Sequence, residues 1–531
     1  MIRIRDLTLT PGQDFGQLLT QASKLLRVKE LEIGRLLVRK KSVDARKKDD
    51  VKLVYTVDVT VHQDEIKLLK RLKNSRLSLA KDPVYQPPTP PAQPQARPVV
   101  VGFGPAGMFA ALVLAQAGLR PIILERGRDA QSRHAAVERF WQAGQLDPEN
   151  NVQFGEGGAG TFSDGKLNTG VKDPRIGWVL EQFAQAGAHE DILFDAKPHI
   201  GTDVLLTVVQ NLRKRIELLG GEVHFGCKLT AISRENGQII AVTYAQDGTE
   251  TTLACERVIL AIGHSARDTF EMLLDTGLPM EAKAFSMGVR IEHLQSDVDA
   301  AQYGDFARHP ALPTADYKLN CRLPDGNSAY TFCMCPGGYV VAAASEAGRV
   351  VTNGMSLCAR SGKNANSALL VTLNPADFPE PGPLGGVRWQ RQLEEQAFQA
   401  GGGGYKAPAQ LVGDFLACRP STALGRITPT YRPGVTLCDL HDVLPEKITA
   451  TLAQALPELA KRLRGFDDPD AVLTAPETRS SSPVRILRGV DCQSTDLRGL
   501  FPCGEGAGYA GGITSAAVDG IRCAEALVAS L

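Results

Sequence analysis

The strongest constraint on the fold of this chain is the stretch Val99–Glu125, which reads VVVGFGPAGMFAALVLAQAGLRPIILE. It contains a buried strand, a G-x-G-x-x-G turn at Gly102, Gly104 and Gly107, a helix to about residue 117 and a second strand. The first glycine permits the tight turn, the second lets the backbone approach a pyrophosphate, and the third allows close packing of helix on strand. Because the helix N-terminus presents free N–H groups and a positive dipole to phosphates, the stretch predicts a dinucleotide-binding βαβ unit.

The second strand of this unit, at 121–124, leads directly into Glu125, 23 positions after Gly102. An acidic residue about 20 positions after the first glycine hydrogen-bonds a ribose 2′-OH in such units. We therefore expect the carboxylate of Glu125 to contact the ribose, with Arg126 beside it in the same site. The cofactor-binding residues predicted from the unit are Gly102, Gly104, Pro105, Ala106, Gly107, Glu125 and Arg126.

The C-terminal stretch 500–527, LFPCGEGAGYAGGITSAAVDGIRCAEAL, resembles the closing FAD motif of flavoproteins with two dinucleotide-binding folds. In that motif a short strand ends in Gly and an acidic residue, and the next helix points its N-terminus at the flavin, where its dipole stabilises the anionic reduced ring. The resemblance favours FAD over NAD, although Glu505 stands where such flavoproteins usually carry Asp. The alternative is a Gly/Ala-rich packed helix after a loop. The matching residues are Gly504, Glu505, Gly512, Ile513 and Thr514.

Two further segments fit the same cofactor site. RVILAIGH at 257–264 resembles the middle motif of this fold, with Gly263 at its turn and Ile262 where the motif usually has Thr. NVQFGEGGAGTFSDGKLNTG at 151–170 is a glycine-rich loop that can bring main-chain N–H groups against a ring or phosphate. Its predicted cofactor contacts are Gly158, Gly160, Thr161 and Ser163.

Three stretches, 151–170, FCMCPGGYVVAAASE at 332–346 and ETRSSSPVRI at 477–486, resemble the family of bacterial and plastid FAD-dependent dehydrogenases. The resemblance extends over nearly the whole chain and includes KKSVDARKK near the N-terminus. That family is similar to the broader class of FAD/NAD(P)-dependent oxidoreductases with an inserted substrate domain. The resemblance therefore implies the fold and the cofactor FAD, and it leaves the substrate open.

Lys166 and the pair Cys333 and Cys335 are candidate catalytic residues. A cation such as Lys166 near a flavin ring favours its reduced anion, and a surface lysine is the alternative. On a regular strand the two thiols point to one face, with Cα atoms about 6.5 to 7 Å apart, at the outer edge of disulfide geometry. A structural or pocket-lining role is therefore the leading interpretation of the C-x-C pair, ahead of a redox or persulfide role and of metal binding.

The segment TRSSSPVR at 478–485 places three hydroxyls between Arg479 and Arg485. Guanidinium groups suit a substrate carboxylate or phosphate. Both arginines are therefore candidate catalytic residues that would orient an anionic small-molecule substrate. A loop held by internal hydrogen bonds is the alternative.

Length and composition predict several domains in a cytoplasmic protein. At 531 residues the chain exceeds one ordinary core, and 43% hydrophobic with 22% charged residues is typical of a globular protein. No uninterrupted apolar run approaches the roughly 18 residues of a membrane span, and the N-terminus has no apolar signal core. The eleven cysteines show no disulfide-framework spacing. We therefore expect reduced thiols and no membrane association.

Composition also divides the chain. We predict a small basic α+β domain at 1–80, a Pro-rich linker at 81–98, an FAD-binding domain in two parts at 99–266 and 476–531, and a mixed β substrate domain at 267–475. The predicted fold class is α/β: a Rossmann-like FAD-binding domain with an inserted substrate domain, or cap, and a small N-terminal domain.

The predicted N-terminal domain is basic. Residues 1–80 carry 18 Lys or Arg against 10 Asp or Glu, whereas the whole chain carries 59 of each. A basic domain tethered to a flavoenzyme can dock an acidic electron-carrier protein, steer an acidic substrate or bind RNA, and a solvated basic surface is the alternative. Nucleic acid ranks last because no aromatic stacking pattern accompanies the charge.

These observations predict an FAD-dependent oxidoreductase that passes hydride or electrons between flavin N5 and an organic substrate or a redox partner. A second complete G-x-G-x-x-G unit is missing, because Gly401–Gly404 has no apolar strand ahead of it. NAD(P)H would therefore act only as a transient donor at the substrate face. Two other functions stay open: a flavoprotein that acts on RNA through the N-terminal domain, and a non-enzymatic electron-transfer flavoprotein.

Overall fold

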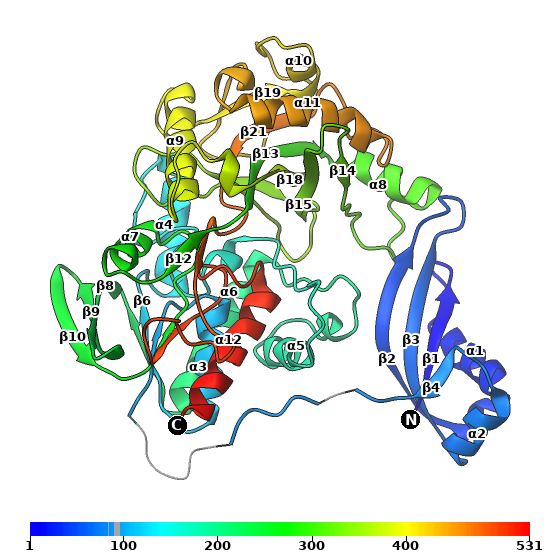
Figure 1. The fold of residues 1–531 in the computed structure, drawn as a ribbon. Helices are drawn as coiled ribbons and strands as arrows, with labels where there is room; N and C mark the ends of the chain where they lie inside the picture. The colour runs from blue at the N-terminus through cyan, green and yellow to red at the C-terminus, as the bar shows by residue number, and fades with distance from the viewer. Residues whose placement is uncertain (83, 90–95) are drawn as a thin grey trace.

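The computed structural model describes residues 1–82, 84–89 and 96–531. Figure 1 shows an N-terminal domain at the right, a parallel sheet with its helices in the lower part, and a larger sheet with its helices above it. The predicted Pro-rich linker falls partly on residue 83 and residues 90–95, which lie outside the described residues. Within the described ranges, every helix is too short or too polar to cross a membrane.

The N-terminal domain is an antiparallel sheet of order β2-β3-β1-β4 with two helices. Alternate apolar residues of β1 and β3 pack with α1 and α2 in one core. This mixture of strands and helices agrees with the α+β class predicted for the N-terminal domain. The bounds are β1 Ile2–Leu9, α1 Gln17–Leu26, β2 Ile33–Asp44, β3 Lys52–Val61, α2 Glu65–Leu72 and β4 Leu77–Leu79.

The lower part holds a parallel sheet of order β23-β11-β5-β6-β7, so the predicted βαβ unit, β5-α3-β6, forms its centre. Helices α3 and α12 pack together, which joins the first and last helices of this part. A small antiparallel sheet, β8-β9-β10, has a hairpin turn at Asp247-Gly248, a residue pair that favours such turns. The bounds are β5 Val99–Val101, α3 Pro105–Gln116, β6 Ile122–Glu125, α4 Ala130–Ala143, α5 Arg175–Gln185, α6 Thr202–Leu218, β7 Glu222–Phe225, β8 Lys228–Glu235, β9 Gln238–Gln246, β10 Thr249–Ala254, β11 Val258–Leu260, α7 Arg267–Asp275, β23 Leu500–Pro502 and α12 Ile513–Ala529.

The upper part, or cap, is a mixed sheet of order β14-β15-β18-β13-β21-β19-β20, in which only β19 and β20 pair in parallel among the described strands. Helix α11 packs on this sheet, and the pair β12 and β22 lies where the chain enters and leaves the cap. The cap helices were not predicted. The bounds are β12 Met280–Ala282, β13 Phe285–Leu294, α8 Gln295–Tyr303, β14 Asn320–Arg322, β15 Ser328–Cys335, β16 Tyr339–Ala342, β17 Thr352–Met355, β18 Asn364–Leu373, α9 Gly385–Ala400, β19 Ala407–Leu411, α10 Val412–Leu416, β20 Val435–Leu437, α11 Glu446–Ala460, β21 Val472–Glu477 and β22 Val484–Ile486.

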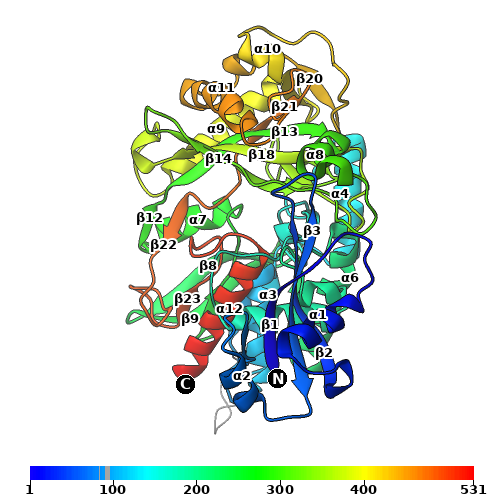
Figure 2. The same ribbon diagram turned by 90° about the vertical axis from the view of Figure 1, so that its right-hand side faces the viewer.

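The N-terminal domain contacts the rest of the molecule through β2. The Lys41 N–H donates to the carbonyl of Phe194 at 2.8 Å, and the Lys41 carbonyl accepts from the N–H of Ala196 at 2.8 Å. Figure 2 shows the strands of this domain in front of the parallel-sheet part. These contacts fix the basic domain beside the segment around residue 195.

Candidate functional site

One cavity of about 600 Å³ joins the predicted cofactor segments and the cap. The lower part contributes the β5–α3 turn, the end of β6, the loop around residue 160, the residues after β11 and the start of α12. The cap contributes residues 316–318 and 331–334, Asn353 and residues around Arg479. The predicted cofactor residues in its wall are Gly102, Pro105, Ala106, Glu125, Arg126, Gly158, Gly160, Ser163, Gly263, Glu505, Gly512 and Ile513.

The glycines of the β5–α3 turn differ in the space around them. A Cβ at Gly107 would lie 1.9 Å from the carbonyl oxygen of Gly102, and a Cβ at Gly102, where φ is +97°, would lie 2.3 Å from that of Ala261. At Gly104, the N-cap of α3, the nearest atom to a Cβ is the Cα of Gly158 at 3.6 Å. The first and third glycines thus pack the turn, and the second leaves room beside the free N–H groups of α3.

Glu125 fixes the same turn. Its carboxylate, in a residue only 5% exposed, accepts the N–H groups of Phe103 and Gly127 at 2.8 Å and of Gly155 at 2.9 Å. These bonds tie the end of β6 to the glycine turn and to the loop of residues 151–170. The residue lies in the cavity wall where a ribose contact was predicted, and holding the turn is a second role that the sequence did not predict.

Two other predicted cofactor residues form hydrogen bonds within the protein. The Thr161 hydroxyl donates to the Glu156 carbonyl at 3.3 Å, and the Thr514 hydroxyl donates to the Leu167 carbonyl at 2.7 Å. Both hydroxyls thus donate within the protein, and contact of these two residues with the cofactor stays a prediction. Among the described residues, the cavity wall does not include Gly104, Gly107, Thr161, Gly504 or Thr514.

The N-terminus of α12 opens onto the cavity. A Cβ on Gly511 or on the N-cap Gly512 would meet no atom of the described residues within 4 Å. Nearby, Nδ1 of His264 lies 3.4 Å from the Glu505 carboxylate, and the buried Nε2 of His264 has no hydrogen-bond partner among the described residues. His264 lines the cavity and was missed as a site residue; its only sequence signal was its position directly after Gly263.

These features fit FAD. The cavity is bordered by α3 at one glycine turn and by α12 at another, and both helices present their positive N-terminal ends. The orphaned Nε2 of His264 and the open space at Gly512 are what a bound polar ring would fill. Bound FAD would supply a two-electron hydride carrier at this place.

On the cap side, the cavity brings two candidate catalytic residues together. Lys166 donates to the carbonyl of Met334, next to Cys333, and its Nζ lies 3.7 Å from the Asp164 carboxylate. The regular strand expected for Cys333 and Cys335 is wrong, because the pairing of β15 with β18 shifts there and Cys333 has a left-handed φ of +43°. Cys333 lines the cavity, and Cys335 is fully buried.

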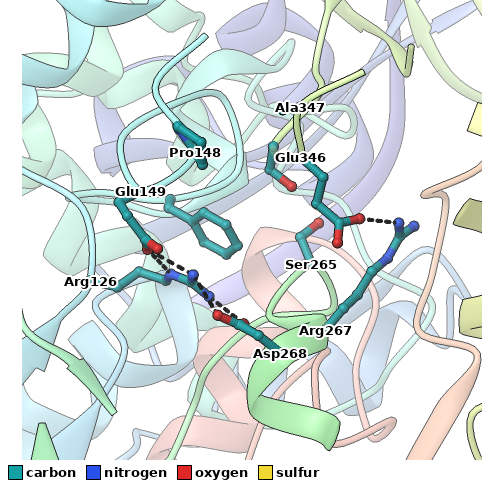
Figure 3. Close-up of a pocket in the computed structure, with 10 residues that line it drawn as sticks. Arg126, Pro148, Glu149, Ser265, Arg267, Asp268, Glu346 and Ala347 are labelled. Carbon is teal, nitrogen blue, oxygen red and sulfur yellow. Dashed lines mark hydrogen bonds and ion pairs between the residues drawn. The ribbon is translucent and has the colours of Figure 1, made fainter. Parts of the chain in front are cut away.

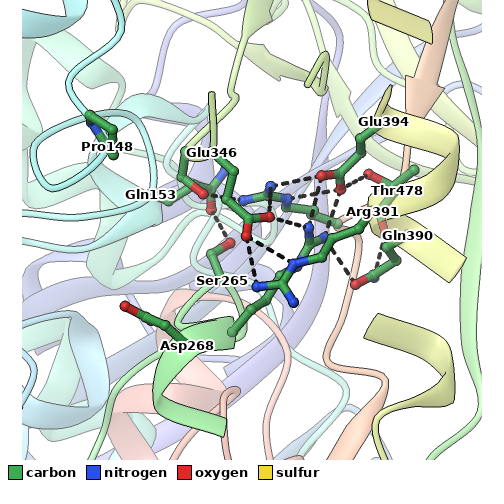
Figure 4. Close-up of polar contacts among 12 residues, drawn as sticks. Pro148, Gln153, Ser265, Asp268, Glu346, Gln390, Arg391, Glu394 and Thr478 are labelled. Carbon is green, nitrogen blue, oxygen red and sulfur yellow. Dashed lines mark hydrogen bonds and ion pairs between the residues drawn. The ribbon is translucent and has the colours of Figure 1, made fainter. Parts of the chain in front are cut away.

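Two buried ion clusters lie near this side of the cavity. In the first, the Glu477 cluster, Arg290 binds both carboxylate oxygens of Glu477 at 3.1 Å and also donates to Asn353, Asn366 and the Cys333 carbonyl. In the second, the Glu394 cluster, one carboxylate is bound by two guanidiniums, and its members are Glu394, Arg267, Arg479, Glu346, Arg391, Gln390 and Thr478 (Figure 4).

The two arginines predicted to orient a substrate are placed differently. Arg479 lies in the cavity wall, but its guanidinium binds Glu394 at 2.9 and 3.1 Å and the Ser345 hydroxyl at 2.5 Å. Arg485 has a 39% exposed side chain 3.4 Å from Glu281, and among the described residues the cavity wall does not include it. The structure therefore corrects the expectation that both guanidiniums point at a substrate in this cavity: Arg479 is bound by Glu394, and Arg485 lies outside the cavity wall, over the Tyr509 ring.

A smaller pocket of about 250 Å³ adjoins the cavity and shares Arg126, Phe154 and Ser265 with it. Figure 3 shows Arg126 between two carboxylates on one side of this pocket and Arg267 with Glu346 on the other. Arg126 lies 2.7 Å from Glu149 and 2.9 Å from Asp268. Arg126 is predicted to lie beside the cofactor, and its positive charge is balanced by the carboxylates of Glu149 and Asp268.

Comparison with known proteins agrees with this geometry. Residues 96–269 match the pyridine nucleotide-disulphide oxidoreductases, residues 284–480 match "FAD-dependent protein, C-terminal domain-like", and residues 1–60 match a domain of unknown function. An "Uncharacterized protein" of Clostridium beijerinckii is 47% identical over 529 residues, which cover 99% of this chain and 98% of that protein.

Two solved structures match over most of this chain at low identity. A triple mutant of a flavin-dependent brominase is 13% identical, with 82% of this chain and 80% of that chain covered at a TM-score of 0.38. A geranylgeranyl bacteriochlorophyll reductase-like protein from Thermoplasma acidophilum is 12% identical, with 82% and 78% covered at a TM-score of 0.37.

The fold, the cavity and the family matches define a flavoprotein with a Rossmann-like FAD-binding domain. The chain belongs to a family of FAD-dependent oxidoreductases, which includes the Clostridium beijerinckii relative.

Proposed function

We propose that the protein passes a hydride between FAD, held across the large cavity, and a small organic substrate that binds on the cap side. The observation that carries the proposal is that the N-termini of α3 and α12 border one cavity whose opposite wall is formed by β15 of the cap. In this proposal α3 binds the pyrophosphate, Glu125 the ribose, and the start of α12 the flavin ring.

The substrate would lie between the flavin and the cap. Lys166, Tyr317, Lys318, Cys333 and Ser480 line that part of the cavity. The ammonium groups of the two lysines favour a substrate with a carboxylate or a phosphate. The predicted domain boundaries belong to the same proposal, with the segment 267–475 supplying the substrate side.

The test is anaerobic stopped-flow spectroscopy of the purified holoprotein, with the flavin band near 450 nm followed while NADH, NADPH, reduced ferredoxin or reduced flavodoxin is added. Rapid bleaching by a nicotinamide would support a reductase with NAD(P)H as transient donor. Bleaching by the protein carrier alone would support an acidic electron carrier as the partner. A protein that binds no FAD, or whose flavin none of these donors reduces, would contradict the proposal.

A matched pair of variants tests the cofactor position. In Gly104→Val the side chain enters the space beside the α3 N-terminus, whereas in Gly177→Val it enters open space on α5. We expect the first variant to lose bound FAD by at least tenfold and the second to keep it, as measured by the flavin absorbance of the purified protein. Equal FAD content in the two variants would place the pyrophosphate elsewhere.

The position of the N-terminal domain supports an acidic electron-carrier protein as the electron donor. Its strand β2 is bonded to residues 194–196, and the next residue, Lys197, lies in the cavity wall and pairs with Asp316 at 2.5 Å. A carrier bound to the basic domain would therefore dock beside the cavity mouth. Deletion of residues 1–80 would then slow reduction by the carrier and leave reduction by a nicotinamide unchanged.

A further inference from the structure

The bulge in β15 sets one cysteine pair apart from the other thiols of the molecule. Phe332 pairs with Ala368 of β18, and the next pair is Cys335 with Asn366, so two residues of β15 oppose one of β18. Such a bulge bends the strand and re-aims a side chain. Here it puts Cys333 into the left-handed region, which costs a residue with a side chain more than it costs glycine.

The bulge also divides the pair between the cavity and the interior. Cys333 lines the cavity, whereas Cys335 is fully buried behind it and its Sγ lies 3.2 Å from the Cys333 carbonyl oxygen. The Cys335 thiol donates to that carbonyl, so its sulfur lies against the main chain of Cys333, whereas the Cα atoms of residues i and i+2 on a regular strand are about 6.5 to 7 Å apart. One sulfur is thus accessible and the other is within its reach.

Two cations hold this segment. Arg290, fully buried, donates to the Cys333 carbonyl at 2.8 Å, and Lys166 donates to the next carbonyl, that of Met334. The hydrogen bond from Cys335, with these cations, lowers the pKa of Cys333 to about 6 against the effect of its burial and of Asp164, whereas burial raises the pKa of Cys335. Cations beside a thiol are what make a cysteine a nucleophile at neutral pH.

All eleven cysteines lie in the described part of the chain. The other cysteines whose pKa shifts move upward, chiefly through burial or a neighbouring thiol, and they are Cys227, Cys255, Cys321, Cys335, Cys358, Cys438, Cys492, Cys503 and Cys523. Cys227 and Cys503 also line the cavity, so what distinguishes Cys333 among the cavity-lining cysteines is its lowered pKa and the cations beside it.

The geometry points to Cys333 and Cys335 as a redox-active dithiol that reduces a small-molecule disulfide, with Cys333 as the attacking and Cys335 as the resolving thiol. The Cys333 thiolate attacks one sulfur of R–S–S–R; a bond forms between Cys333 and that sulfur, the disulfide bond breaks and RS⁻ leaves. Cys335 then gives its proton to RS⁻ and attacks Sγ of Cys333, which forms the Cys333–Cys335 disulfide and releases the second RS⁻, protonated from solvent.

In this reaction the substrate gains two electrons and the pair loses two. The return of the pair to the dithiol needs two electrons and two protons, the amount that one reduced flavin and one further proton supply, and in this respect the inference rests on the proposed function. The class of substrate follows from access, because a cavity of about 600 Å³ shared with a cofactor admits a small molecule and no folded protein.

The first test is the pH profile of alkylation of Cys333 in the holoprotein, with iodoacetamide and peptide mass spectrometry. We expect a midpoint near pH 6. At pH 5.5 the rate should exceed that of N-acetylcysteine about tenfold, since the greater thiolate fraction outweighs the lower nucleophilicity of a weakly basic thiolate. A midpoint above pH 8, with the peptide accessible to the reagent, would overturn the proposal.

The second test treats the holoprotein anaerobically with oxidised glutathione, in a Cys418→Ser background that removes an exposed thiol. The unchanged pair should form the Cys333–Cys335 disulfide, and Cys335→Ser and Cys335→Ala should each trap glutathione on Cys333. Cys333→Ser should form neither product while it keeps its FAD. Absence of both products in the unchanged pair would refute the dithiol.

These readouts separate the two proposals. If donors reduce the flavin but Cys333 forms no disulfide, the dithiol fails and the proposed function stands. If the disulfide forms but no donor reduces the flavin, the proposed function fails and the dithiol stands.

Discussion

The Glu394 and Glu477 clusters are both buried, and both meet the chain at the end of β21, but they divide charge differently. In the Glu394 cluster two guanidiniums, from Arg267 and Arg479, bind one carboxylate at distances from 2.7 to 3.1 Å. In the Glu477 cluster the single guanidinium of Arg290 is divided among a carboxylate, two amides and the Cys333 carbonyl.

The pKa values of the two carboxyl groups follow this difference. Burial pushes the pKa of Glu394 upward, but Arg267 and Arg479 outweigh it and hold that pKa far below its usual range. At Glu477 burial prevails over Arg290, and the pKa is raised. The number of cations per buried carboxyl therefore decides whether the group is a fixed ion that holds the fold or a group that can exchange its charge beside the Cys333 thiolate.

The comparison would be sharpened most by Glu394→Gln. The substitution leaves Arg267 and Arg479 buried without their shared carboxylate, so we expect the free energy of unfolding at pH 7 to fall by about 3–5 kcal/mol in a urea titration. The control is Glu271→Gln, which removes a half-exposed partner of Arg391 and should cost less than about 1 kcal/mol. Similar losses in the two variants would mean that the cluster does not hold the fold.

Arg290→Met comes next in expected size. It removes the cation of the Glu477 cluster, but Glu477 can then take up a proton, so we expect a loss of roughly 2–3 kcal/mol in the same titration. The alkylation midpoint of Cys333 should rise at the same time, because Arg290 stabilises the thiolate. Arg388→Met, whose partner Glu380 is exposed, is the control for loss of an arginine. An unchanged alkylation midpoint would mean that Arg290 does not stabilise the Cys333 thiolate.

The two carboxyl groups should respond to pH with opposite sign. The folded pKa of Glu394 is lowered, so its stabilisation is fully present above the unfolded value of about 4.3 and is lost progressively as the pH falls from that value toward the folded pKa. The folded pKa of Glu477 is raised, so its contribution is present below about pH 4.3 and is lost as the pH rises.

The measurement is urea unfolding of wild type, Glu394→Gln and Glu477→Gln between pH 3.5 and 7. The stability difference between wild type and Glu394→Gln should grow with pH, and that between wild type and Glu477→Gln should shrink, each by at most about 1.4 kcal/mol per pH unit. Two differences that change in the same direction would break the comparison.

The smallest expected effect is that of Lys166→Met. Lys166 contributes to the low pKa of Cys333 as the more solvated of its two cations, so alkylation at pH 6 should slow by roughly two- to threefold. Lys172→Met, in the exposed segment after the same loop, is the matched control and should leave the rate unchanged. If alkylation of Cys333 slowed as much in Lys166→Met as in Arg290→Met, Lys166 would be the cation that stabilises the Cys333 thiolate most.

Much of the parallel-sheet part could be read from the sequence, and much of the cap could not. The turn at Gly102 and Gly107 was predictable because two of the reasons for glycine there are local: a positive φ at Gly102, and contact of a Cβ at Gly107 with the Gly102 carbonyl oxygen. The α12 motif was predictable for a similar reason, since Gly512 caps its helix with φ of +97°. The cap helices were missed because their apolar residues pack against a sheet whose strands come from distant segments of the chain.

The candidate site shows the same division at single residues. The residue types of Cys333, Lys166 and Arg479 indicated candidate catalytic residues. The sequence also predicted a regular strand at Cys333 and a guanidinium free to bind substrate at Arg479. The strand is bulged by its pairing with β18, and the guanidinium is bound by Glu394, 85 positions away. His264 and Arg290 were missed because a lone histidine and a strand arginine have no spacing that indicates their partners.

The sequence by itself determined the dinucleotide-binding class and the placement of three glycine-rich segments around a cofactor, because the backbone conformation of each glycine turn is settled by neighbours in the chain. Only the tertiary structure decided which charged side chains are paired with another group of the protein and which can still contact a substrate. Arg290 meets Glu477 across 187 positions and Lys166 meets Met334 across 168, and the sheet register that creates these contacts leaves no periodic trace in the sequence.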